Sequence, residues 1–422
     1  MAMTSRERVQ AALAHQQPDR VPVDFGATAV TGIAASAVYR LRQALRMDPP
    51  GMPVKVVEPY QMLGEIAADL RQTLGVDCVG LGGRKNMFGF ENTGWKPWTL
   101  FDGTPVLVPA GFNTEPAPNG DIYMYPQGDK SVPPSGRMPK NGFYFDAIVR
   151  QPPIKEPGLD VEDNLEEFEP ISDDELEYLR QQADDLDRNT SQAVVGSFGG
   201  TSFGDIALVP GLMLKHPRGI RDIEEWYVST VSRHSYIAEV FERQCELGIK
   251  NLARIHQAVG DKVSVVFVTG TDFGTQLRPF VSPTTYRLLY MPVHKRVNEW
   301  IHTHTNWKTF IHSCGSIMPL IPEFIEAGFD ILNPVQCSAA NMSAEDLKKR
   351  FGRDIVFWGG GIDTQQTLPF GTPQEVREQV TERLQILGQG GGFIFNAVHN
   401  IQATVPIGNV LAMFDALRVQ WS

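Results

Sequence analysis

A histidine and a cysteine stand two residues apart at the end of a short apolar run, in Thr309-Phe-Ile-His312-Ser-Cys314-Gly315. In a β-strand, side chains at positions i and i+2 project from the same face, so His312 and Cys314 would point to one spot. Imidazole nitrogen and thiolate sulfur are ligands that zinc prefers. The alternative is a buried core histidine beside a small apolar cysteine. The glycine turn that follows favours the metal site, because it opens the next helix where barrel enzymes place their chemistry.

A catalytic zinc site needs a third protein ligand, and the later sequence holds two candidates. His399 follows the last predicted strand, and Cys337 follows the strand after His312. Both would lie on loops at the same end of a parallel barrel. We favour His399, because its loop, residues 396–402, carries several other polar groups. Cys337 stays open as the alternative third ligand.

Each of the later predicted strands ends in a polar or glycine-rich cluster, and such loops converge on one cavity in a barrel. Asp272 and Asp363 lie in two of these clusters and are candidates for a general acid or base, or for binding a polar substrate group. For Asp363 the alternative is a turn or helix cap. The other polar residues expected to contact a substrate are Gln276, Asn333, Gln336, Asn396 and Gln402.

Short apolar runs alternate with helical patterns along most of the chain. Eight runs predict strands: residues 20–25, 78–81, 193–196, 263–268, 308–312, 329–333, 355–359 and 392–396. Eight such units favour an α/β fold, a (β/α)₈ TIM barrel, as a single domain over residues 1–422. Between residues 94 and 151, aromatic residues interrupted by Asp-Gly, Asn-Gly and prolines predict a β-rich insertion in the N-terminal half.

Helices are predicted between these runs. Thr4 and Glu7 have the spacing of a capping box at the start of the first helix. Residues 60–74 and 283–304 also have apolar residues at helical spacing.

Composition narrows the function classes. The 422 residues include 49 acidic and 38 basic side chains, a net charge of −11, which argues against nucleic acid as the main partner. No apolar run is long enough to span a bilayer, and the N-terminus lacks a signal-peptide stretch, so we expect no membrane partner. The four cysteines are scattered and form no disulfide framework. The cytoplasm is the expected compartment.

With these residues placed, the chain resembles the uroporphyrinogen decarboxylase-like superfamily, and within it the branch of corrinoid (cobalamin)-dependent methyltransferases. The resemblance is strongest over Thr271-Asp272-Phe-Gly-Thr-Gln276, His312-Ser-Cys314-Gly and residues 329–336, 357–365 and 399–402. It implies a barrel that meets a separate corrinoid protein at the C-terminal mouth of its strands. It also implies that zinc is bound by an H-x-C pair and a later cysteine. This chain has His399 where that cysteine falls, and Cys337 is kept as the alternative.

The resemblance implies methyl transfer between a small methylated substrate, or a thiol or folate acceptor, and the cobalt of the partner's corrinoid. Zinc would bind a thiol and lower its pKa, or would act as a Lewis acid on an ether or amine. A demethylation reaction is included in this expectation. The alternatives are a uroporphyrinogen decarboxylase-like lyase and a non-catalytic small-molecule-binding barrel. The sequence is compatible with a homo-oligomer. The methyl donor and acceptor are not specified by these motifs.

Overall fold

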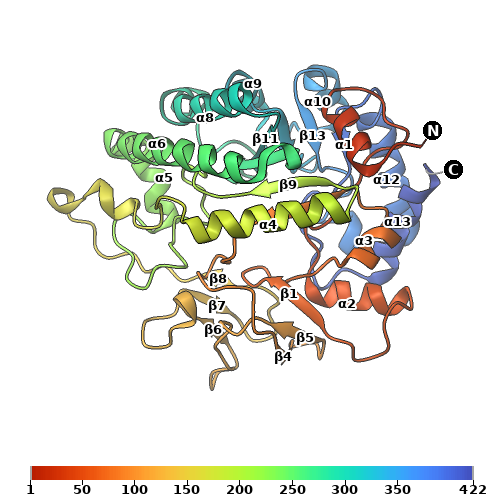
Figure 1. Cartoon of the computed structure of the whole chain (residues 1–422), viewed down its shortest axis with the longest axis horizontal. Helices are drawn as coiled ribbons and strands as arrows, with labels where there is room; N and C mark the ends of the chain where they lie inside the picture. The colour runs from red at the N-terminus through yellow and green to blue at the C-terminus, as the bar shows by residue number, and fades with distance from the viewer. Residues whose placement is uncertain (1, 421–422) are drawn as a thin grey trace.

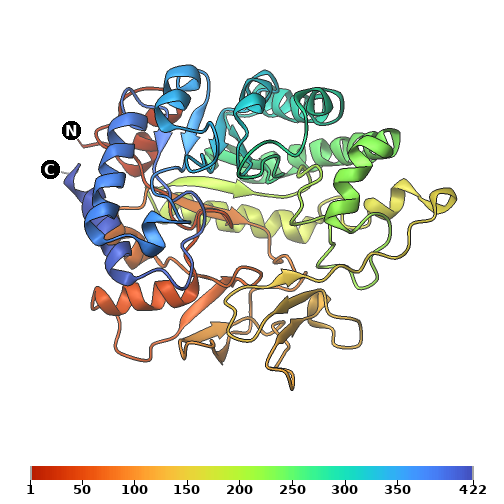
Figure 2. The same cartoon turned by 180° about the vertical axis from the view of Figure 1, so that it is seen from behind.

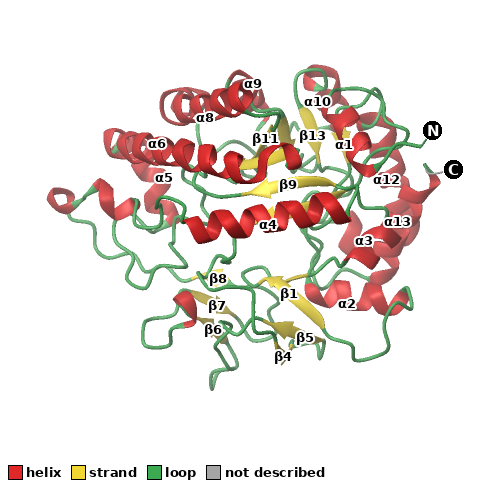
Figure 3. Ribbon diagram, in the orientation of Figure 1, coloured by secondary structure: helices red, strands yellow, loops and turns green. Residues whose placement is uncertain are grey.

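A parallel sheet forms the centre of the computed structural model, which describes residues 2–420. Seven strands follow the order β14-β13-β12-β11-β10-β9-β3, and Figures 1 and 3 label three of them, β9, β11 and β13. Every neighbouring pair is parallel. The strands are β3 (Cys78–Gly82), β9 (Ala193–Ser197), β10 (Val265–Thr269), β11 (Lys308–His312), β12 (Ile331–Asn333), β13 (Val356–Trp358) and β14 (Phe393–Ile394).

Val23 closes this sheet by pairing with both edge strands. It forms a parallel bridge with Phe395, directly after β14. Its carbonyl accepts a hydrogen bond from the N–H of Asp77, directly before β3, at 2.7 Å. Pro22 has no N–H, which keeps this eighth segment short. The predicted (β/α)₈ barrel is therefore confirmed as a fold, but within residues 2–420 only seven of its eight predicted strands form, and residues 20–25 contribute the single bridge at Val23.

Helices cover the outside of the barrel (Figures 1 and 2). They are α2 (Ala35–Ala44), α3 (Ala68–Leu74), α4 (Asp173–Asn189), α5 (Ile223–Ser232), α6 (His234–Val259), α7 (Pro283–Thr285), α8 (Met291–His304), α9 (Ile321–Glu326), α10 (Ala344–Phe351), α11 (Thr367–Phe370), α12 (Pro373–Leu387) and α13 (Ile407–Val419). None of the helices in residues 2–420 has the length and apolar character needed to cross a membrane.

The first helix, α1 (Ser5–Leu13), lies at the N-terminal end of the strands. Its capping box of Thr4 and Glu7 is present as predicted. Ala12 accepts a hydrogen bond from Gly392, directly before β14. Apolar residues of α1 join alternate residues of the barrel strands in one buried cluster, which includes Cys78, Val195, Val265, Phe310, Ile331, Val356 and Ile394. The N-terminal end is thus filled, and the polar chemistry is left to the other end.

Short strands form two small sheets below the barrel in Figure 3. One has the order β2-β1-β5-β4 and the other β6-β7-β8. The strands are β1 (Val54–Glu58), β2 (Leu63–Gly64), β4 (Lys96–Thr99), β5 (Pro105–Val108), β6 (Ile122–Met124), β7 (Gly136–Met138) and β8 (Asp146–Ala147). Because β1 pairs with β5, this β-rich layer begins at Val54, before the predicted start at residue 94.

Two predicted helices differ from the structure. The helix expected over residues 60–74 begins only at Ala68, because residues 63–64 pair with β1 and the chain before them turns at Glu58. The helix expected over residues 283–304 is divided by a π-helical turn, Tyr286–Tyr290. Pro292 follows in the first turn of α8 and cannot donate a helical hydrogen bond, which accounts for the local change in helix type.

Candidate metal centre

Three predicted ligands lie together at the C-terminal mouth of the barrel. One ligand atom each of His312, Cys314 and His399 lie within 4.8 Å of one another. Nε2 of His312 is 3.5 Å from Sγ of Cys314. A tetrahedral zinc ion, with Zn–S of about 2.3 Å and Zn–N of about 2.05 Å, would separate sulfur from nitrogen by about 3.5 Å. The spacing of this pair therefore fits a zinc ion.

The end of β11 directs both side chains into the mouth. Phe310 belongs to the buried cluster inside the barrel. His312 lies two residues later on the same strand, so its side chain also points into the barrel. Ser313 continues the pairing with β12 by donating its N–H to the carbonyl of Asn333 at 2.8 Å. Gly315 then turns the chain with φ +89°, and a Cβ there would come within 2.4 Å of the backbone of Gly274. Only glycine is accommodated after Cys314.

Asn333 determines which nitrogen of His312 carries the proton. The amide of Asn333 donates from Nδ2 to the carbonyl of Trp358 at 2.7 Å, which fixes the orientation of its Oδ1. That oxygen lies 2.5 Å from Nδ1 of His312 and can only accept a hydrogen bond. Nδ1 therefore holds the proton, and the lone pair of Nε2 is directed toward Cys314 and is available to a metal.

Electrostatics at the site favour the arrival of a cation. Burial and the negative charge of Asp272 raise the pKa of Cys314 well above its ordinary value, so the thiol stays protonated without one. Burial and the adjacent His312 lower the pKa of His399 to about 3, so its imidazole is neutral. Nδ1 of His399 accepts a hydrogen bond from the N–H of Asn400 at 2.8 Å. The Nε2 lone pair of His312 and a thiol that loses its proton are ready donors for zinc. The neutral ring of His399 holds its proton on Nε2 while Nδ1 accepts from Asn400, so binding of a metal by His399 requires a change of tautomer or loss of that hydrogen bond.

The two predicted carboxylates have different positions. Asp272 accepts a hydrogen bond from the N–H of Cys314 at 2.6 Å, and its Oδ1 lies 3.8 Å from Nε2 of His312. Its side chain is 25% exposed, so it lies at the site and reaches solvent. Asp363 instead accepts a hydrogen bond from the N–H of Gln365 and caps its own turn, in the way the alternative interpretation predicts.

The predicted substrate-binding residues form a partial ring. Gln336 fixes the ligand turn by accepting a hydrogen bond from the N–H of Gly315 at 2.8 Å. Gln276 and Gln336 both donate to Oε1 of Gln365, at 3.3 and 3.5 Å. Gln402 lies apart and lines a separate hollow beside β8.

Asn396 and Cys337 lie at the edge of this arrangement. Asn396 is buried and donates to the carbonyl of Asp24 at 2.7 Å, while its own Oδ1 has no partner within residues 2–420. Cys337 lies outside the group of three ligands and packs against the main hydrophobic core. Burial raises the pKa of Cys337 to about 11.

Asp205 is a mouth residue that the sequence reasoning missed. It lies in the loop after β9, and its Oδ2 is 2.6 Å from the position that a Cβ on Gly270 would occupy. Burial, together with the charge of Asp272, raises its pKa to about 7. The signal was present, because Gly204-Asp205 follows a strand end as Asp272 does.

Comparisons with known proteins agree with this fold. The family model described as "Uroporphyrinogen decarboxylase (URO-D)" matches residues 238–419, which contain all three candidate ligands. A uroporphyrinogen decarboxylase from Trichodesmium erythraeum (strain IMS101) is 23% identical over 287 residues, which cover 67% of this chain and 74% of that protein. A solved methyltransferase from Methanosarcina mazei has a TM-score of 0.55 at 16% identity, with both chains covered completely. Residues 238–419 thus resemble the uroporphyrinogen decarboxylase family, and the chain as a whole has the fold of the solved methyltransferase.

Proposed function

We propose that this protein is a zinc-dependent methyltransferase that moves a methyl group between a small methylated compound and a corrinoid carried by a partner protein. A thiol or folate is the alternative acceptor. The observation that supports it most is the convergence of His312, Cys314 and His399 at the barrel mouth. The fold shared with a Methanosarcina mazei methyltransferase supports it further. When bound, zinc would supply Lewis acidity to the methylated substrate or lower the pKa of a thiol.

The residues of this chain hold and orient such a centre. Asn333 keeps the proton of His312 on Nδ1, and Gln336 fixes the turn after Cys314. Asp272 accepts the N–H of Cys314 and lies beside His312, where its carboxylate can take or return a proton at the departing group of the substrate. Asp363 supports the loop that carries Gln365. We assign substrate contact to Gln276 and Gln336, which meet at that glutamine.

Decarboxylation of uroporphyrinogen is the second candidate, because the family model and the curated relative carry that name. Its substrate bears several carboxylates, which require cationic partners. Arg8 and Arg20 are already paired with the buried carboxylate of Asp77, at 2.7 and 2.8 Å, next to the start of β3. These two arginines are thus engaged with Asp77 and leave Arg71 as the arginine that lines the cavity beside β3, one cation for a substrate with several carboxylates, which favours methyl transfer.

Elemental analysis combined with a methyl-transfer assay tests the proposal. Purified protein should bind about one zinc per chain and transfer methyl groups to free cob(I)alamin from some of a panel of methoxylated aromatics, methylamines and methylated thiols. Cys314→Ala should lose both the metal and turnover. Cys245→Ala, a buried cysteine on α6, is the matched control and should keep both.

The third ligand is decided by a pair of variants. His399→Ala should lose zinc and Cys337→Ala should retain it, because only His399 lies within the ligand group. Full metal content and turnover in Cys314→Ala would refute the metal centre. Release of carbon dioxide from uroporphyrinogen, without methyl transfer, would favour the second candidate.

A further inference from the structure

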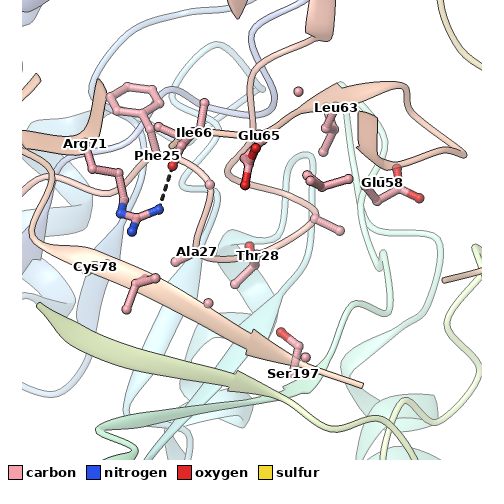
Figure 4. A pocket seen from close by; sticks show the side chains of 18 residues that line it. Phe25, Ala27, Thr28, Glu58, Leu63, Glu65, Ile66, Arg71, Cys78 and Ser197 are labelled. Atoms are coloured by element: carbon pink, nitrogen blue, oxygen red, sulfur yellow. Dashed lines mark hydrogen bonds between the residues drawn. The ribbon is translucent and has the colours of Figure 1, made fainter. Parts of the chain in front are cut away.

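A cavity of about 300 Å³ extends along β3, from its first residue, Cys78, to the barrel mouth, where β3 and β9 end (Figure 4). Gly82 and Ser197, the last residues of these strands, line it. The strands run parallel to β11, so they end at the same mouth as His312. Loop 25–32 and the β1–β2 segment, residues 57–66, supply the opposite wall. A space of this volume accommodates a small molecule.

Charged side chains of opposite sign lie at different positions along this cavity. Figure 4 shows the guanidinium group of Arg71 beside Phe25 and Ile66 at one end, the carboxylate of Glu58 at the other, and Glu65 between them. A ligand that extends along the cavity would have a positive charge beside one end, at Arg71, and negative charges beside its middle and other end, at Glu65 and Glu58.

Arg71 keeps part of its hydrogen-bonding capacity for a ligand. Its Nε donates to Oε1 of Gln192 at 3.0 Å, and its Nη1 donates to the carbonyl of Ile66 at 2.6 Å. These two bonds hold the guanidinium group in place, Nη2 makes no hydrogen bond within residues 2–420, and the residue lines the cavity. Burial lowers the pKa of Arg71, while the negative charges of Glu65 and Asp69 partly offset this effect. A carboxylate that bonds directly to the guanidinium group would stabilise its charge further.

Glu58 is held rigidly at the other end. Its two carboxylate oxygens accept the N–H groups of Tyr60 and Gln61, at 3.0 and 2.7 Å. Burial raises its pKa to about 7, and no cation within residues 2–420 contributes to lowering it. Glu65 makes only a loose, exposed pair with Lys55, at 3.7 Å. A cationic group in the cavity would therefore supply a charge partner that the protein lacks.

The acidic end of the cavity is joined to the loop of the metal centre. Gln61, which binds Glu58 through its N–H, accepts a hydrogen bond from Nδ2 of Asn400 at 2.7 Å. Asn400 directly follows His399 and also accepts the N–H of Gly32 at 2.5 Å. The cavity wall and the ligand loop are thus one bonded unit, with the negative charges on the side of the metal centre.

We propose that this cavity binds a small zwitterionic N-methylated amino acid, with its carboxylate at Arg71 and its methylated ammonium group at Glu58 and Glu65. A purely anionic substrate would be repelled by the carboxylates of Glu58 and Glu65. A neutral methyl ether would leave charged groups without partners in a confined space. The role of this ligand as methyl donor rests on the proposed function, whereas its binding does not.

Binding to the metal-free protein tests the site without methyl transfer. We would titrate three probes and follow ligand-detected NMR: N,N,N-trimethylglycine, its carbon isostere 3,3-dimethylbutanoate, which lacks the positive charge, and tetramethylammonium, which lacks the carboxylate. The zwitterion should bind at least tenfold more tightly than either of the others. Equal affinity of the isostere, or no saturable binding of the zwitterion, would overturn the proposal.

Two variants locate the binding. Gly82 has only the carbonyl oxygen of Ser197, at 3.9 Å, near the position of a Cβ, so Gly82→Leu should fill the cavity and abolish binding. Gly158→Leu, at a glycine with nothing within 4 Å, is the matched control and should bind as the parent does. Glu65→Gln should reduce the preference for the zwitterion over its isostere, and Glu382→Gln, on the exposed face of α12, should not. Unchanged binding in Gly82→Leu would place the ligand elsewhere.

The two proposals fail separately. Saturable binding of the zwitterion without methyl transfer would refute the proposed function and keep this site. Zinc-dependent methyl transfer from another class of compound, without binding of the zwitterion, would keep the function and refute this substrate.

Discussion

Replacing Asn333 by alanine should weaken zinc binding, although its side chain is not a predicted ligand. Its Oδ1 holds the proton of His312 on Nδ1, and its Nδ2 donates to the carbonyl of Trp358 at 2.7 Å. Asn298 on α8 offers an unusually close control. It is also 0% exposed, and its Nδ2 donates to the carbonyl of Ala327 at the same 2.7 Å. Only Asn333 contacts a candidate ligand.

The expected magnitudes separate stability from metal affinity. Each variant leaves one buried carbonyl without its donor, which costs about 1–3 kcal/mol of unfolding free energy. Asn333→Ala also releases His312 to exchange its proton between two nitrogens and to rotate. Loss of such an outer contact weakens metal binding about 10- to 100-fold, or about 1.4–2.7 kcal/mol. Asn298→Ala should change zinc affinity by less than about threefold.

Competition with a chromophoric chelator at pH 7.5 would give the zinc dissociation constants, and urea denaturation of the metal-free proteins would give the unfolding free energies. We expect similar losses of stability in the two variants and a loss of affinity in Asn333→Ala alone. Equal zinc affinities for the two variants would refute the assignment of the proton on His312. It would also imply that the contact at 2.5 Å does not orient the ring.

Two further predictions concern the closure of the barrel and its pH dependence. Asp77→Ala removes a carboxylate from buried ion pairs with Arg8 and Arg20 and should cost about 3–5 kcal/mol in urea denaturation, whereas Asp187→Ala, which removes an exposed pair, should cost below about 1 kcal/mol. Burial raises the pKa of Asp24 from 3.8 to about 6. The folding stability that comes with protonated Asp24 is therefore fully present below pH 3.8 and is lost as pH rises through about 6. The loss is on the order of 3 kcal/mol, and Asp24→Asn should show a correspondingly flatter stability profile between pH 4 and 7; an unchanged slope would contradict it.

The later half of the fold was predictable because its signals are local. Strands β10 to β14 are short apolar runs bounded by glycine and polar residues, and each carries its own loop at the mouth. Two-residue spacing sufficed to place His312 and Cys314 on one face of β11. The prediction that His399 would reach them needed only the rule that parallel strands end together.

The remaining features depend on contacts between distant residues. Val23 acts as a barrel strand through bonds to Phe395 and Asp77, and a single bridge leaves little pattern in the sequence. The role of Asn333 follows from the position of the carbonyl of Trp358, which no local spacing reveals. The cavity was missed for the same reason, because Glu58 and Arg71 come to line one cavity only when β1 and α3 pack beside β3.

The choice between His399 and Cys337 as third ligand changes the charge of the centre. A zinc ion bound by one thiolate and two neutral imidazoles keeps a net charge of about +1, whereas two thiolates and one imidazole would neutralise it. His399 lies within the ligand group, and Cys337 packs against the core with a pKa raised to about 11. The proposed centre with His399 as third ligand would therefore carry the positive charge. When bound, such a centre would supply Lewis acidity to the group that departs in the proposed demethylation. The cavity complements it, because Glu58 and Glu65 counter the repulsion between that centre and a methylated ammonium group.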